Sequence, residues 1–166
     1  MSEHTFRFIA PPLWLLALTV SGVNIGMALL APAIPMLRDD LSASGDEAQL
    51  VLSAFLVMLG LGQLVAGSLS DTLGRRPVLL SGSLLFAIAG AAALVAPTIE
   101  LLILARAVQG FGASACMAVG RVIINDSFDR TEAGRQLSTI TMIQSIVPLL
   151  GFAGGGLIAD FIGWRG

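Results

Sequence analysis

The sequence predicts an all-α, polytopic membrane protein with five transmembrane helices. Only 12% of its 166 residues are charged, whereas a soluble domain usually has about 25%. No Asp, Glu, Lys or Arg occurs in residues 48–70, 78–96 or 137–159. A run of about 18 or more such residues is long enough to cross a bilayer as a helix. A soluble bundle is the alternative, but soluble helices present a polar face that these runs do not have.

Five helices account for the apolar runs. The first run, from Leu13 to Met36, exceeds the roughly 7–15 residues of a secretory signal core, so we interpret it as a retained helix. Pro77 falls in the first turn of the third helix, where its missing N–H is tolerated, and Pro97 closes that helix. The predicted helices span about 13–37, 48–70, 78–96, 101–125 and 137–160, with joints at 38–47, 71–77, 97–100 and 126–136 and an end segment at 161–166.

The positions of the arginines predict which side of the membrane each joint faces. With the N-terminus in the cytoplasm, two arginines, Arg38 and Arg165, lie outside and the other joint and tail arginines lie inside. This distribution satisfies the positive-inside rule. We therefore expect a multi-pass protein of the inner (cytoplasmic) membrane, with a cytoplasmic N-terminus and an external C-terminus. The inside arginines are Arg7, Arg75, Arg76, Arg130 and Arg135.

The composition argues against several other classes of protein. A net charge of −2 gives no support to nucleic-acid binding. Cys116 and His4 are the only cysteine and histidine, so the sequence supplies neither a metal-ligand cluster nor a histidine base. A membrane-embedded enzyme would need a nucleophile, a metal cluster or paired acids within the membrane, and we find none. The segment GSLSDTLGRRP at 67–77 lacks the G-K-[ST] ending of a phosphate loop. We expect no cofactor and no enzymatic activity.

The joint after the second helix gathers charge between two charge-free runs. Gly67 and Asp71 stand four residues apart and share a helix face, and Arg75 takes the next i+4 position if the helix continues. Gly67 would let another helix approach the aspartate, and Gly74 allows a tight turn. Because Asp71 opposes the dipole at a helix C-terminus, we expect a compensating arginine or helix N-terminus beside it.

This joint resembles a signature of the major facilitator superfamily. Motif A of that family reads roughly G-x-x-x-D-x-x-G-R-[RK]. LLILARAVQGFGAS at 101–114 is similar to motif B, and IVPLLGFAGGGLIADFIGWR at 146–165 resembles motif C of the drug:proton antiporters. NIGMALLAPAIPML at 24–37 is similar to the end of the first helix in that branch. The resemblance covers essentially the whole chain. It implies a conformational switch on the cytoplasmic side, formed by Gly67, Asp71, Gly74, Arg75 and Arg76.

Arg106 is the predicted coupling residue. It lies five residues into the fourth predicted helix, and an arginine costs about 2.5 kcal/mol or more at the membrane centre, so it should face the bundle interior. The resemblance implies that Arg106 and Gln109 line the transport cavity and couple proton or substrate movement. The alternative is that Arg106 reaches the outer surface or pairs with Glu100. Asn24 stands in the first helix, where many drug antiporters carry an acidic residue, and an asparagine cannot titrate.

A charge clamp is expected at the cytoplasmic end of the fourth helix. Arg121 lies close to that end, and Asp126 follows about one turn later. We expect Arg121 to hold Asp126, with Asp71 as a further partner.

The fifth helix is expected to bend at motif C. That motif usually has Gly-Pro where this chain has Gly151 followed by Phe152, so part of the bend must depend on Pro148. A proline there removes a hydrogen bond to the carbonyl of Gln144. Gly155 completes the predicted bend region.

The resemblance implies a secondary active transporter, most similar to proton-coupled exporters of drugs or other small molecules, that works by alternating access. Its expected partners are the lipid bilayer, a small-molecule substrate and protons. Because facilitators typically have twelve helices in two halves, we expect this chain to be the N-terminal part of a longer transporter, without its C-terminal portion and inactive alone. The alternative is a non-transporting membrane fragment or an assembly partner of another chain.

Overall fold

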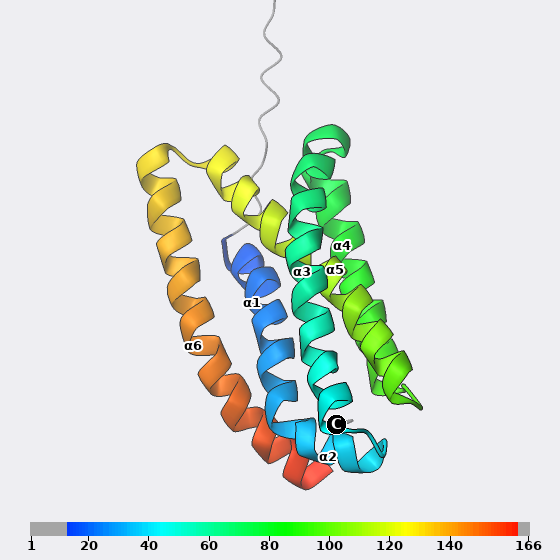
Figure 1. Ribbon diagram of the computed structural model, residues 1–166. Coiled ribbons are helices and arrows are strands. Elements are labelled where there is room, and N and C mark those ends of the chain that lie inside the picture. The colour runs from blue at the N-terminus through cyan, green and yellow to red at the C-terminus, as the bar shows by residue number, and fades with distance from the viewer. Residues whose placement is uncertain (1–12, 163–166) are drawn as a thin grey trace, which may run out of the picture.

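The computed structural model describes residues 13–162, with side chains described for 20–154 apart from residue 29. Within this part of the chain five helices are long and apolar enough to cross a membrane, which confirms the predicted all-α membrane class. Figure 1 shows them running up and down through one bundle. The predictions that concern Arg7, Arg165 and residues 163–166 lie outside the described residues. The elements are α1 (Leu13–Leu30), the 3-10 turn η1 (Ala31–Ala33), α2 (Ile34–Asp40), α3 (Gly45–Leu73), α4 (Arg75–Leu94), α5 (Ile99–Ser127) and α6 (Arg130–Ile162).

The first predicted helix, 13–37, is interrupted rather than continuous. α1 stops at Leu30, and α2 follows only after the turn η1. Pro32 and Pro35 explain the interruption, because neither has an N–H to donate to the carbonyl four residues earlier. Leu37 of α2 is completely buried, so the short helix after the break still packs into the bundle.

Side-chain caps fix the starts of α3 and α6 earlier than the apolar runs suggest. Ser44 and Glu47 form a capping box, in which the Glu47 N–H donates to Ser44 Oγ at 3.2 Å and the Ser44 N–H donates to Glu47 Oε2 at 2.8 Å. Before α6, Asp129 Oδ1 accepts from the N–H of Glu132 at 2.9 Å. These caps satisfy backbone donors that would otherwise be orphaned. The expected joint at 126–136 therefore shrinks to two residues between α5 and α6.

Helix α5 occupies the centre of the bundle. It packs along α3 and α4 and also contacts α1 and α6 (Figure 1). Glycines allow these close contacts. A Cβ added to Gly110 would collide with the carbonyl of Phe55 on α3, and one added to Gly112 would lie 2.8 Å from the carbonyl oxygen of Gly82 on α4. In lipid, close backbone approach at small residues stabilises helix pairs, so these glycines hold α5 between its neighbours.

Helix α6 packs mainly against α1, and the two helices begin at the same end of the bundle and run in the same direction (Figure 1). Large apolar side chains cover much of the outer surface. Leu64, Val95 and Leu149 are each 71–77% exposed. In water, exposing such large apolar side chains would be unfavourable. A hydrocarbon surrounding makes this exposure favourable.

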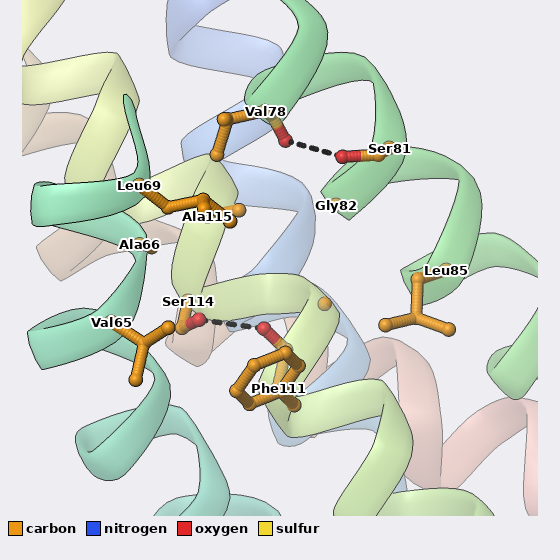
Figure 2. Close-up of a pocket in the computed structure, with 11 residues that line it drawn as sticks. Val65, Ala66, Leu69, Val78, Ser81, Gly82, Leu85, Phe111, Ser114 and Ala115 are labelled. Atoms are coloured by element: carbon orange, nitrogen blue, oxygen red, sulfur yellow. Dashed lines mark hydrogen bonds between the residues drawn. The ribbon is translucent and has the colours of Figure 1, made fainter. Parts of the chain in front are cut away.

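An apolar groove runs between α3 and α4, and α5 forms its floor (Figure 2). Its volume is about 120 Å³. Two hydroxyls lie in it, but both are engaged within their own helices. Ser81 Oγ donates to the carbonyl of Val78 at 3.2 Å, and Ser114 Oγ donates to that of Phe111 at 2.6 Å. The groove therefore presents mainly hydrocarbon surface.

Candidate functional site

A single residue, Gly74, separates α3 from α4. Its backbone angles of φ +93° and ψ 157° lie in a region that is open almost only to glycine. Its N–H donates to the carbonyl of Ser70 at 3.1 Å, which ends α3. The turn directs α4 back along the bundle and places Arg75 at the first position of α4, beside the end of α3.

The side chain of Arg75 joins three helices. Its Nη1 donates to Ser70 Oγ at 2.8 Å and to the carboxylate of Asp71, both on α3, and its Nε donates to Asp126 Oδ2 on α5 at 3.1 Å. The arginine side chain is 22% exposed, whereas those of Asp71 and Asp126 are 66% and 49% exposed. The guanidinium thus offsets two carboxylates that stand at unfavourable helix C-termini. We call Ser70, Asp71, Arg75 and Asp126 the junction cluster.

The partner of Asp126 differs from the expected one. Asp126 pairs with Arg75, and within the described residues no ion pair joins it to Arg121, which is exposed. Helix geometry gives the reason. Five residues correspond to about 500°, so the two side chains leave α5 about 140° apart. Asp126 therefore faces the start of α4, and Arg121 does not.

Gly67 and Arg76 take no part in the junction cluster. A Cβ added to Gly67 would meet nothing within 4 Å, so the described part of the chain places no helix there, and the close approach expected at Gly67 stays a prediction. Arg76 is exposed. Its neighbour Arg75 makes all the ion pairs that the described junction contains.

A second polar cluster lies on α5. Arg106 Nη1 donates to Gln109 Oε1 at 3.0 Å, while Arg106 Nε is buried without a hydrogen-bond partner. Gln109 is only 6% exposed and packs so closely on α4 that a Cβ added to Gly90 would lie 2.8 Å from its Nε2. The structure thus joins Arg106 to Gln109, and the described ion pairs do not include one between Arg106 and Glu100.

Asn24 is not joined to this cluster by a described hydrogen bond. Its Nδ2 donates to the carbonyl of Val20, one turn earlier in α1, at 3.4 Å. The side chain is half-buried. Its amide thus folds back on its own helix instead of reaching Arg106.

The motif C residues lie along α6. Pro148 stands inside this helix. Gly151 contacts α1, where an added Cβ would lie 2.5 Å from the Cβ of Ala28. Gly155 belongs to the helix, but its surroundings lie outside the described residues. A small residue at 151 is therefore needed for the contact between α1 and α6.

Two contributors to these clusters were not predicted from the sequence. Ser70 is 1% exposed and binds Arg75, and the only sequence signal for this is a polar residue at the end of an apolar helix. Gly90 provides space for Gln109 on another helix. The residues around Gly90 give no signal for that contact, because a glycine in an apolar helix could equally well face lipid.

The fold and these clusters define a multi-pass α-helical membrane protein, with a charged junction at one end of the bundle and an arginine held in its central helix. Residues 15–166 match the profile of the Major Facilitator Superfamily. The chain belongs to this superfamily.

Several curated relatives are similar over most of the chain. The chloramphenicol resistance protein of Pseudomonas aeruginosa is 35% identical over 147 residues, which cover 86% of this chain and 34% of the relative. Multidrug resistance protein D of Escherichia coli is 33% identical over 153 residues, covering 92% and 39%. An uncharacterized MFS-type transporter of Bacillus subtilis, YdgK, is 39% identical over 145 residues, covering 86% and 36%. The chain therefore spans about a third of the length of these relatives.

Proposed function

We propose that this chain forms the first five helices of a proton-coupled secondary transporter that exports drugs or other small molecules by alternating access. One observation carries the proposal: most of the chain is similar to proteins named for chloramphenicol and multidrug resistance. We propose that the chain acts in transport and not as an enzyme, in line with its membership of the Major Facilitator Superfamily. Because the chain spans about a third of such relatives, we propose that it transports only together with further helices and is inactive alone.

Arg106 and Gln109 are the proposed coupling pair. Their hydrogen bond fixes the guanidinium on α5, and the buried Nε of Arg106 still has a proton to donate. That donor suits a polar or anionic group of a substrate, or a carboxylate that gains and loses a proton. Asn24 would contribute an amide from α1 to the same path. Since an asparagine cannot titrate, the titrating group would be a carboxylate of the further helices or of the junction cluster.

The junction cluster is the proposed conformational switch, together with Gly67 and Arg76. Arg75 holds the ends of α3, α4 and α5 together, and these bonds would have to be exchanged when the two halves rock. Arg121 and Asp126 stay the proposed cytoplasmic charge clamp, with Asp126 paired to Arg75 in the arrangement described here. Pro148, Gly151 and Gly155 would supply the bend of α6.

We propose that the junction faces the cytoplasm of the inner membrane, because most of the joint arginines then lie inside. The variant Arg76→Cys tests this orientation, since Arg76 is exposed and the native Cys116 is buried. A membrane-impermeant maleimide is expected to label the variant in inside-out vesicles and not in intact cells. The unchanged chain provides the background signal from Cys116. Labelling in intact cells would reverse the proposed orientation.

The transport proposal is tested with a chimera. This chain replaces the corresponding segment of E. coli multidrug resistance protein D, to which it is 33% identical, in a host that lacks its own drug exporters. We expect the chimera to lower chloramphenicol accumulation in the cells. The chimera with Arg106→Ala should lose this effect at equal membrane abundance. The 166-residue chain alone should not change chloramphenicol accumulation. An abundant chimera without export, or export by the chain alone, would contradict the proposal.

A further inference from the structure

Two buried polar atoms, one on α1 and one on α6, have no hydrogen-bond partner. They are Ser21 Oγ and Gln144 Nε2. Ser21 is 5% exposed, and Gln144 is half-buried with its amide nitrogen covered. Inside a bilayer an unsatisfied polar group costs several kcal/mol, because hydrocarbon offers no replacement partner. Neither atom takes part in the junction cluster or the Arg106 pair.

The helix register places these two atoms opposite each other. Gly151 contacts Ala28, which fixes one point of contact between the parallel helices α6 and α1. Ser21 stands seven residues before Ala28, and Gln144 stands seven residues before Gly151. Seven residues are close to two full turns. Ser21 therefore lies on the same face of α1 as Ala28, and Gln144 lies on the same face of α6 as Gly151. Both are two turns before that contact, so they lie opposite each other.

A third polar group lies beside them. Residue 148 is a proline inside α6 and has no N–H to donate to the carbonyl of Gln144. Gln144 therefore brings an amide donor and a backbone acceptor to the interface, and the hydroxyl of Ser21 can both donate and accept. Two to four such partners are what a buried water molecule requires.

We infer that Ser21 and Gln144 bind a buried water molecule between α1 and α6. The water oxygen accepts from Gln144 Nε2, and the water protons are donated to Ser21 Oγ and the carbonyl of Gln144. The bridge satisfies both side chains without bringing them into direct contact. Because a bridging water is nearly as favourable as a direct hydrogen bond, it attaches α6 to α1 one turn before Pro148.

A double-mutant cycle on the 166-residue chain in detergent tests the coupling of the two residues. The buried thiol of Cys116 becomes reactive to a fluorogenic maleimide when the bundle unfolds, which gives an unfolding temperature. We expect Ser21→Ala and Gln144→Met each to lower this temperature by about 2–4 °C. The unfolding temperature of the double variant should fall by clearly less than the sum of the two single decreases, because neither partner is then left unpaired. Ser145→Ala is the control, since the Ser145 hydroxyl bonds to Thr141 within α6, and it should cause no shift.

Solid-state NMR of the chain in bilayers tests for the water itself. With 15N-labelled glutamine, we expect polarisation transfer from water to the side-chain amide of Gln144, reduced at least twofold in Ser21→Ala and restored in Ser21→Thr. Additive shifts in the cycle would overturn the inference. So would coupling without the water signal, which would indicate a direct bond between Ser21 and Gln144. Coupling together with the water signal establishes the site, whether or not the chimera exports drugs.

Discussion

Substitution of Gly110 by alanine is expected to disrupt the bundle. The new Cβ would overlap the carbonyl of Phe55, which is backbone on α3 and cannot rotate away. Overpacking of this kind costs about 1–3 kcal/mol or more, so α5 and α3 would have to separate along their main contact. We expect the unfolding temperature, measured by the reactivity of Cys116, to fall by at least about 4 °C, with a lower yield of monodisperse protein in detergent.

Gly60→Ala is the matched control for this prediction. Gly60 lies inside α3, like Phe55, but a Cβ added there meets nothing within 4 Å. Alanine is the better helix former by about 1 kcal/mol, so this variant should be as stable as the unchanged chain or slightly more stable. Equal stability of the Gly110 and Gly60 variants would contradict the close packing of α5 on α3.

Substitution of Arg75 by glutamine is expected to loosen the ends of α3, α4 and α5. Glutamine has no charge and cannot span Ser70, Asp71 and Asp126 together. The two carboxylates are well exposed, so their contribution is reduced by solvent screening, and we expect a loss of about 1–2 kcal/mol. Hydrogen–deuterium exchange should rise several-fold in the last turns of α3 and α5 and stay unchanged at the opposite ends of these helices.

The neighbouring Arg76→Gln serves as the control, because it removes the same charge from an exposed side chain outside the junction cluster. Exchange in that variant should match the unchanged chain. If both substitutions raised exchange equally, net charge at this membrane face would explain the effect, and the specific bonds of Arg75 would not.

Much of the fold was accessible from the sequence because it depends on local patterns. Charge-free runs identify membrane helices whatever their neighbours are, and i+4 spacing brings Asp71 to Arg75 within one turn. The early start of α6 also has a local signal. Asp129 is followed three residues later by Glu132, which is the spacing of a helix cap.

Contacts between segments far apart in the chain could not be predicted from local sequence patterns. Asp126 meets Arg75 across 51 positions in the chain, and the choice of Arg75 over Arg121 depends on the rotation of α5 relative to α4. Gln109 finds its space at Gly90 for a similar reason. Both contacts depend on the packing angle and register of two helices. A helix that is apolar on all sides does not show which face meets its neighbour, so its sequence does not predict either quantity.

The central place of α5 has a consequence for biogenesis. α3 and α4 are joined by one residue, yet each packs far more extensively on α5 than on the other. During synthesis this hairpin leaves the ribosome before α5 does, so it enters the bilayer with its principal docking partner still unmade. Consolidation of the nascent bundle must then wait for α5.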